Sequence, residues 1–229
     1  MSAFFVTATG TDIGKTFITA GLIRVLREAG GHAVALKPVI SGFSMEGAGA
    51  SDSGILLTAM GEAISEDTLN RISPWRFSEP LSPDMAAARE GRSVDFASLT
   101  GFCCDAVQGH TGTLFIEGVG GVMVPLDASH SVLDWMATLN LPLIVVAGGY
   151  LGTISHSLTA LDVLHAHGLN IAALVVNEGD ADPVSADETM ASMRPFAHDV
   201  PMVRMPRSAN WEQQRESFTN LARLLGLTG

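Results

Sequence analysis

The amino-acid sequence predicts an α/β fold: a doubly wound, mostly parallel sheet with helices on both faces. Short runs of β-branched and aromatic residues alternate along the chain with longer segments whose apolar residues recur at helical spacing. The short runs are almost continuously apolar, which is typical of strands buried on both faces of a parallel sheet. Helices that follow such strands cover the two faces, and this alternation defines the fold class.

The first strand is expected at residues 3–7 and the first helix at residues 16–29, where apolar positions from Ile18 to Leu26 share one face. The glycine pair at residues 30–31 ends this helix. Further strands are expected at residues 32–39, 113–116, 143–147, 171–176 and 202–203. Further helices are expected at residues 131–139, 154–166, 183–193 and 211–225.

Length and composition predict one domain over residues 1–229. A hydrophobic content of 47% and a charged content of 16% provide a sizeable core and argue against disorder. The Gly- and Ser-rich residues 42–54 are expected to form a mobile loop, and the Pro-rich residues 74–83 a second irregular region. Neither segment is long enough to divide the chain.

Charge and apolar pattern argue against several classes of partner. The formal net charge is −11, and general nucleic-acid binding needs a basic face for phosphate contacts. The apolar runs are shorter than the roughly 20 residues of a membrane span, and the N-terminus lacks the features of a secretory signal. The only cysteines, Cys103 and Cys104, are neighbours in a predicted helix. We interpret both as buried thiols in a reducing cytoplasm. The charge and the apolar pattern predict a protein without a nucleic-acid or membrane partner.

The strongest chemical signal is the turn at residues 9–16 (TGTDIGKT), between the first predicted strand and the first predicted helix. A turn at this place aims backbone N–H groups and the helix N-terminus at a phosphate. Lys15 can then reach the outer phosphates, and the Thr16 hydroxyl can bind Mg²⁺. The usual spacing puts a glycine five residues before Gly14, whereas this chain has Thr9 there and a glycine one residue later.

Further polar side chains are expected at the same edge of the sheet. Glu117 follows a buried strand, and an acid at the carboxyl end of such a strand faces the ligand crevice, where it can bind Mg²⁺. Lys37, near the end of the second predicted strand, is interpreted as a crevice residue, and Ser41 after it as a hydrogen-bonding group for a substrate. Asp52 has two open interpretations: a further carboxylate for the metal, or a solvated loop acid or N-cap of a helix from Ser53.

In their order along the chain, these motifs resemble the dethiobiotin synthetase family, whose members have the fold of P-loop NTPases. The resemblance runs through the whole chain, and the ordered set of motifs is specific to this family. It is carried by residues 5–7, 11–16, 37–39, 41–42, 51–52, 79–80, 82–83, 117–121, 151–156 and 176–177.

The resemblance implies an ATP- and Mg²⁺-dependent ligase of biotin biosynthesis. Such enzymes insert CO₂ between the two amines of 7,8-diaminopelargonate to form the cyclic urea of dethiobiotin. One amine forms a carbamate with CO₂, ATP phosphorylates the carbamate to a carbamic-phosphoric anhydride, and the second amine displaces phosphate as the ring closes. ATP leaves as ADP, and the protein needs no covalent nucleophile.

The resemblance also implies roles for individual residues. Catalytic roles fall on Lys37, Lys15, Thr11 and Ser41. ATP would be bound by Asp12, Ile13, Gly14, Lys15, Thr16, Phe17, Asp52, Glu117, Gly118, Val119, Gly120, Asn177, Pro206, Arg207 and Ser208. Mg²⁺ would be bound by Thr16, Asp52 and Glu117. The diamine would be bound by Ser41 and, at the start of a helix of the second subunit, by Leu151, Gly152, Thr153 and Ser155. The active enzyme would therefore be a homodimer.

The chain departs from the pattern of the family at three positions. Ala8 stands where many members have a glycine, and the small methyl group is expected to be tolerated. Tyr150 stands where some members have lysine, and Ser155 where asparagine is common. His156 matches the motif, but no role is assigned to it.

Two other functions compete with this interpretation. A nucleotide-driven switch of the partition or division-site type shares the first strand, turn and helix, but it carries a lysine four residues before Gly14, where this chain has Gly10. An amidotransferase-type synthetase needs a nucleophilic cysteine, and no Gly-rich elbow surrounds Cys103 and Cys104. Phosphate release that depends on the diamine would separate the ligase from the switch.

Overall fold

In the computed structural model, which describes residues 1–228, six strands form one sheet in the order β2-β5-β1-β6-β7-β8. The strands are β1 (Ser2–Ala8), β2 (Ala33–Leu36), β5 (Thr113–Glu117), β6 (Leu143–Gly148), β7 (Ile171–Asn177) and β8 (Met202–Met205). Every neighbouring pair is parallel. The central strand β1 is buried from Phe4 to Ala8, as expected for a strand covered on both faces. The predicted fold class is thereby confirmed.

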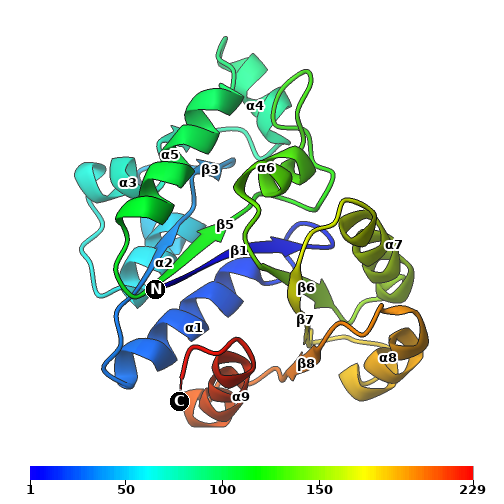
Figure 1. Cartoon of the computed structure of the whole chain (residues 1–229). Coiled ribbons are helices and arrows are strands. Elements are labelled where there is room, and N and C mark those ends of the chain that lie inside the picture. Colours follow the sequence, from blue (N-terminus) through cyan, green and yellow to red (C-terminus); the bar gives the residue numbers. More distant parts are fainter. Residues whose placement is uncertain (229) are drawn as a thin grey trace.

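Helices cover the two faces of the sheet (Figure 1). On one side α1 (Lys15–Glu28) packs against α9 (Trp211–Leu224). On the other side lie α5 (Phe96–Gly109), α6 (Val132–Leu139) and α7 (Thr153–Ala166). The rings of Phe5 in β1 and Trp135 in α6 pack edge to face, with 4.9 Å between the ring centroids, so this helix lies directly on the sheet. The last strands are joined by α8 (Ala186–Met193) and a short 3₁₀ turn, η2 (Arg194–Phe196).

The second predicted strand, residues 32–39, is wrong as one continuous element. β2 ends at Leu36, and a separate strand, β3 (Val39–Ile40), pairs with β4 (Trp75–Arg76) in a second, two-stranded sheet. Pro38 explains the break, because proline has no N–H to donate to a strand and restricts the backbone of the residue before it. Lys37 therefore lies in the bend between the two sheets.

The prediction of a loop over residues 42–54 is also wrong at its carboxyl-terminal boundary. This segment contains a 3₁₀ turn, η1 (Ala48–Ala50), and its last residues already belong to α2 (Asp52–Ala59). The irregular region at residues 74–83 contains β4 and the first residue of α4 (Pro83–Arg89). The same part of the chain contains α3 (Glu66–Ile72). The sequence predicted a helix around Cys103 and, in one of the two interpretations of Asp52, a helix from Ser53.

The prediction of one domain over residues 1–229 stays a prediction, and its last residue lies outside the described part of the chain. Among the described residues, no helix has the length and apolar content needed to cross a membrane.

Candidate nucleotide and substrate crevice

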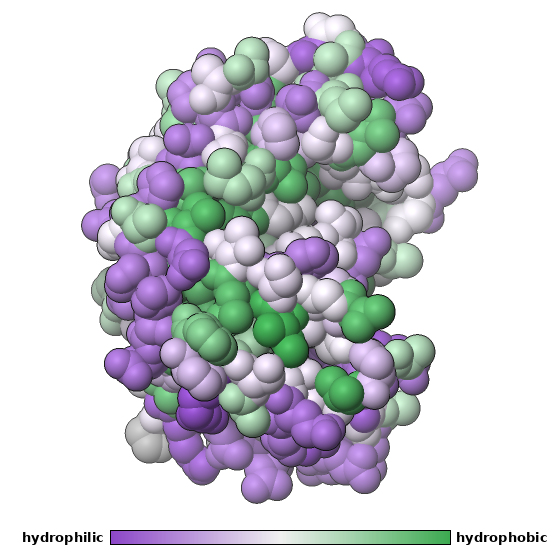
Figure 2. All heavy atoms as spheres, turned by 90° about the vertical axis from the view of Figure 1, so that its right-hand side faces the viewer, coloured by the Kyte–Doolittle hydropathy of each residue, from purple (hydrophilic) through white to green (hydrophobic). Residues whose placement is uncertain are grey.

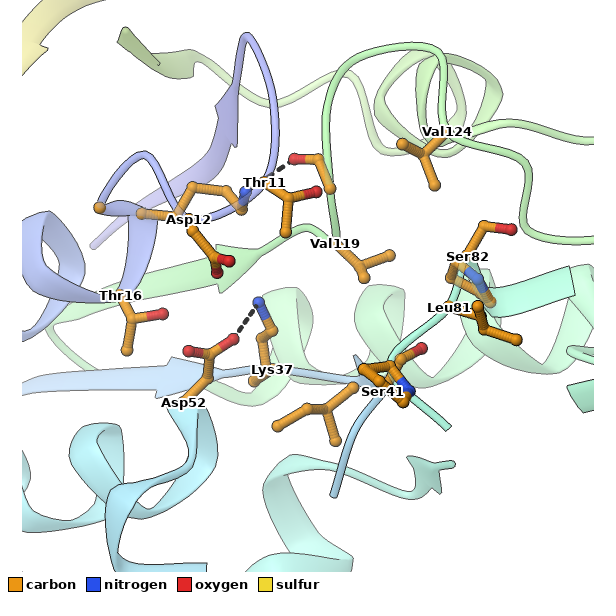
Figure 3. A pocket seen from close by; sticks show the side chains of 16 residues that line it. Thr11, Asp12, Thr16, Lys37, Ser41, Asp52, Leu81, Ser82, Val119 and Val124 are labelled. Carbon is orange, nitrogen blue, oxygen red and sulfur yellow. Dashed lines mark hydrogen bonds and ion pairs between the residues drawn. The ribbon is translucent and has the colours of Figure 1, made fainter. Parts of the chain in front are cut away.

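The main cavity opens at the carboxyl ends of the central strands, where an open α/β sheet binds its ligands. It measures about 710 Å³ and lies between the turn after β1, the loop after β5 and the bend after β2 (Figure 3). Its lining consists of Thr11, Asp12, Gly14, Lys15, Thr16, Lys37, Ile40, Ser41, Asp52, Pro80, Leu81, Ser82, Pro83, Val119, Gly120 and Val124. All four residues predicted to be catalytic therefore face one cavity.

Lys37 lies at the centre of a buried ion cluster in this cavity. Its Nζ donates to Glu117 Oε1 at 2.7 Å and to the Gly118 carbonyl at 2.9 Å, and it forms an ion pair with Asp52 Oδ2 at 2.9 Å. Only 2% of the Lys37 side chain is exposed. Burial alone would lower the pKa of Lys37, but the two carboxylates outweigh it and raise that pKa. The ammonium group is therefore charged at neutral pH and is held in one place.

Glu117 has one carboxylate oxygen in use and one free for a ligand. Its Oε1 accepts hydrogen bonds from Lys37 and, at 2.7 Å, from the Thr16 hydroxyl. Its Oε2 is buried without a hydrogen-bond partner among the described residues. A buried carboxylate oxygen without a partner is costly, and a bound cation would satisfy it.

Asp52 is the second carboxylate of the cluster. Burial raises the pKa of Asp52, but the adjacent Lys37 ammonium, with help from the Thr16 hydroxyl, lowers that pKa overall. Residues 1–228 contain no cluster of three or more His, Cys, Asp or Glu arranged as a metal site. Two carboxylates and one hydroxyl nevertheless fit Mg²⁺, which is usually held by one or two carboxylates together with phosphate oxygens and water. The loop-acid interpretation of Asp52 is not supported, since Asp52 begins α2 and Ser51 is its N-cap.

Lys15 bridges two loops at the other side of the cavity. Its Nζ donates to the carbonyl oxygens of Gly10 at 3.0 Å and Gly120 at 2.7 Å. Burial, together with repulsion from Lys37, lowers the pKa of Lys15 to about 8. The two lysines thus differ. Lys37 is ion-paired with two carboxylates and its pKa is raised, whereas the pKa of Lys15 lies near 8, only slightly above neutral pH.

The turn after β1 has the backbone that its sequence predicts. Gly14 has a φ of 105°, which favours glycine. A Cβ atom at this position would lie 2.3 Å from Nδ2 of Asn177, so no other residue fits there without displacing that side chain. Asn177 itself donates from Nδ2 to the Ile13 carbonyl at 2.9 Å. The predicted adenine-binding asparagine is thereby fixed to the phosphate-binding turn.

The remaining wall of the cavity is largely apolar. It is formed by Ile40, Leu81, Val119 and Val124, and prolines flank it. Ser41 lies beside this wall, and its hydroxyl is buried without a hydrogen-bond partner in the described part of the chain. The sequence did not predict Ile40, Leu81 or Val124 as site residues, although the Pro80 and Pro83 motifs beside them carried part of the resemblance.

A second cavity of about 480 Å³ adjoins the same turn on its other side. Asn177 and Arg207 line it, together with residues of the turn and of the loop after β6. Pro206 and Ser208 flank Arg207 in sequence but line neither cavity. The Phe17 ring packs against the Phe218 ring, with 5.3 Å between their centroids, and so lies between α1 and α9. The part of Phe17 that could contact a phosphate is therefore its backbone.

The residues predicted to bind the substrate carboxylate lie apart from the main cavity of their own chain. None of Leu151, Gly152, Thr153 or Ser155 lines it. The Thr153 hydroxyl donates to the Gly148 carbonyl at 2.6 Å, whereas Leu151 is 89% exposed. Figure 2 shows the face that carries α7, where apolar side chains gather near the centre of a mostly polar surface.

Cys103 does not fit the amidotransferase alternative. Burial raises the pKa of the Cys103 thiol to about 12, so a nucleophilic thiolate is disfavoured. Both cysteines are free; Cys103 is buried, as expected, whereas Cys104 is only half-buried.

Comparison with known proteins shows that this chain is similar in sequence to one protein family over most of its length. A family model described as an AAA domain matches residues 2–209. The chain is 47% identical to the ATP-dependent dethiobiotin synthetase BioD of Acidiphilium cryptum, covering 92% of this chain and 96% of that protein. It is 46% identical to the protein of the same name from Methylobacterium nodulans, covering 83% and 87% of the two chains.

Comparison with solved structures adds the fold alone. The MinD cell division protein of Aquifex aeolicus superposes with a TM-score of 0.60 at 10% identity, covering 100% of this chain and 98% of that chain. The cell division ATPase MinD of Pyrococcus furiosus gives a TM-score of 0.56 at 16% identity, covering 99% of each chain. At such low identity these structures support the P-loop architecture and carry no argument for a switch function.

Proposed function

The chain belongs to the ATP-dependent dethiobiotin synthetase family, and from this premise we propose how its crevice performs the ligase reaction. The observation that carries the proposal is the position of Lys37. Its ammonium group lies between Glu117 and Asp52, beside a phosphate-binding turn and an apolar wall. ATP and an amine substrate with an aliphatic chain can therefore meet at one fixed positive charge.

ATP would be held by the turn after β1. The backbone N–H groups from Asp12 to Phe17 would contact the phosphates, and Lys15 would exchange its two carbonyl partners for phosphate oxygens. Asn177 would contact the edge of the adenine base, with residues 206–208 beside it. Mg²⁺ would be bound by Thr16, Asp52 and Glu117, where it would neutralise phosphate charge.

The diamine, 7,8-diaminopelargonate, would place its alkyl chain on the apolar wall formed by Ile40, Leu81 and Val124. The Ser41 and Thr11 hydroxyls would then contact the amine that has reacted with CO₂. The resulting carbamate attacks the γ-phosphate of ATP, ADP leaves, and the second amine displaces phosphate as the urea ring closes. The Lys37 ammonium would stabilise the negative charge that develops on the transferred group.

The substrate carboxylate would be bound by a second copy of the chain. The start of α7, with Leu151, Gly152, Thr153 and Ser155, is exposed toward solvent except for Thr153, and it offers helix N–H groups to an anion. We therefore propose a homodimer with composite sites, acting in the cytoplasm as a single-domain enzyme.

Diamine-dependent phosphate release tests the proposed reaction. Protein incubated with Mg-ATP, bicarbonate and 7,8-diaminopelargonate should release phosphate only when the diamine is present. Product can be identified by mass spectrometry as the cyclic urea. Turnover without the diamine that DNA or lipid vesicles stimulate would contradict the proposal and support a switch ATPase.

A second test removes the central charge. The substitution Lys37→Ala should lower kcat by at least about 100-fold, because the transferred group loses its fixed counter-charge. Nucleotide binding, measured with a fluorescent ADP analogue, should be largely retained. Turnover equal to that of the unmodified enzyme would remove Lys37 from the mechanism.

A further inference from the structure

The carboxyl end of α3 and the residue after it contact two segments that carry the ion cluster: the backbone of Lys37 and the first turn of α2. The Ile72 carbonyl accepts the backbone N–H of Lys37 at 3.0 Å, which fixes the backbone from which the lysine side chain extends. The next residue, Ser73, contacts Ser53 in the first turn of α2, with 2.6 Å between their hydroxyl oxygens. One short segment therefore holds both the lysine and the helix that carries Asp52.

The contact between the two serines is completely buried. Both residues are 0% exposed, although serine is mostly found at protein surfaces. One hydroxyl donates and the other accepts, so each serine oxygen has a hydrogen-bond partner. An apolar residue at either position would keep the packing but lose the directional bond between α2 and α3.

The first turn of α2 is also in contact with η1 (Ala48–Ala50). A Cβ atom on Gly54 would lie 1.9 Å from the Ala48 carbonyl oxygen, so η1 packs directly on the helix backbone. Ser51 caps the helix: its Oγ accepts the Gly54 N–H at 3.2 Å and donates to the Ala48 carbonyl at 2.7 Å. The first turn of α2 therefore has contacts with both η1 and Ser73.

Asp52 is the residue of this turn that reaches the cluster. Its side chain is 41% exposed, so packing around the carboxylate itself does not fix its position on Lys37. The position of the carboxylate depends instead on the backbone of Asp52 and Ser53. The serine contact is the one side-chain hydrogen bond that the described structure gives between this turn and α3.

From this geometry we propose that Ser53 and Ser73 are positioning residues for the ligase reaction: their hydrogen bond keeps Asp52 on Lys37 and on the expected Mg²⁺ position. This inference rests on the proposed roles of Lys37 and Asp52. Neither serine touches substrate. Their effect passes through the backbone of α2, where a displacement below 1 Å is enough to disturb a metal–phosphate geometry.

The test compares Ser53→Ala, Ser73→Ala and the double variant with Thr100→Val. The control removes a buried hydroxyl in α5 that bonds only within its own helix. Each single variant leaves one buried hydroxyl unpaired and should lower the unfolding temperature, whereas the double variant leaves none and should be more stable than either single variant. This difference separates unfolding from positioning.

The decisive readouts are the Mg²⁺ requirement and the mobility of α2. The double variant should need about tenfold more Mg²⁺ for half-maximal rate and have a lower kcat, with KM for the diamine within about twofold. Its backbone amides at residues 52–57 should exchange faster with deuterium, whereas those of Thr100→Val should not change there. A double variant with an unchanged Mg²⁺ requirement and unchanged exchange would overturn the proposal.

The same experiment separates this inference from the proposed function. If Lys37→Ala loses turnover while the serine variants keep the Mg²⁺ requirement and exchange of the unmodified protein, only the positioning proposal is wrong. If Lys37→Ala keeps full turnover, the proposed site is wrong, and the positioning proposal that rests on it is overturned too.

Discussion

Lys15 and Lys37 are both buried at one crevice, yet their surroundings shift their pKa values in opposite directions. Lys37 has two carboxylates within 3 Å, and its pKa is raised. Lys15 has carbonyl oxygens as its partners, and burial lowers its pKa to about 8. A carbonyl dipole compensates a buried charge less well than a full negative charge does. A bound polyanion such as a nucleotide phosphate would therefore stabilise the charged form of Lys15 more than its present carbonyl partners do.

This difference predicts that nucleotide affinity depends on pH above about 8. Below that value Lys15 is protonated in the free protein and can bind phosphate directly. As the pH rises through the pKa of about 8, the protonated fraction falls, and affinity should fall by up to about tenfold per pH unit. Lys37 contributes no change in this range because its pKa is raised. Titrations with a fluorescent ADP analogue between pH 7 and 9.5 measure the effect.

The variant Lys15→Arg serves as the matched control, since a guanidinium group stays charged throughout this range. Whatever affinity this variant retains should be independent of pH. A flat profile for the unmodified protein would show that the burial of Lys15 does not lower its pKa enough to matter.

At the residue scale, the sequence was informative where a polar side chain follows a buried strand. Glu117 and Lys37 could be predicted at one crevice because parallel strands end at the same edge. The lysine lies one residue beyond its strand, which leaves this argument intact. The contact between Ser53 and Ser73 could not be predicted, since serine contributes nothing to an apolar pattern and the two residues belong to separate parts of the chain, Ser53 in α2 and Ser73 directly after α3. Leu81 was missed for a similar reason: an apolar residue in an irregular loop carries no signal of a ligand site.

At the element scale, the β1–turn–α1 unit determines where phosphate can bind. The turn needs Gly14 for two separate reasons: a φ of 105°, and Asn177 placed where a Cβ atom would stand. Because Asn177 ends β7, the turn is packed against a strand far away in sequence. A side chain at Gly14 should therefore affect both nucleotide binding and stability.

The variant Gly14→Ala should lose most nucleotide affinity and lower the free energy of unfolding by at least about 1–2 kcal/mol, the cost of a left-handed backbone for alanine. The clash with Asn177 adds to this cost. Thermal unfolding and nucleotide titration measure the two effects. In Gly10→Ala the added atom would meet only the flexible end of Ile13 at 3.0 Å, so its stability should stay near that of the unmodified protein. Equal stability of Gly14→Ala and Gly10→Ala would contradict this account.

The elements with a strong apolar pattern could be predicted best, although α5, with 14 residues, was expected only as a helix around Cys103 and Cys104, without bounds. The buried strands of the main sheet and the helices after them have strong apolar patterns, and they were found within a few residues of their bounds. β3 and β4 have two residues each, and α3 and α4 have seven, too few to show a period. These short elements build the apolar and serine-bearing side of the crevice. The side of the crevice that we propose for phosphate could therefore be predicted, and the side that we propose for the diamine only in part.

At the scale of the whole molecule, the carboxylate of the diamine has few cationic partners. The chain has 13 Lys and Arg against 24 Asp and Glu, and in the proposed mechanism its two crevice lysines serve the phosphates and the transferred group. A carboxylate must then be bound mainly by backbone N–H groups. The exposed start of α7 offers such groups but does not line the main cavity of its own chain, and under the proposed function a second copy supplies it.

A heterodimer with one defect in each chain tests these composite sites. One chain carries Lys37→Ala and the other Ser155→Asp, which puts a negative charge at the exposed start of α7, where it would repel the substrate carboxylate. Each homodimer should be nearly inactive. In the heterodimer one site receives both defects and the other receives neither, so it should have about half the activity of the unmodified dimer. Co-expression with two different affinity tags isolates this heterodimer for kinetic measurement. If each site were complete within one chain, both sites of the heterodimer would be defective and no activity would return.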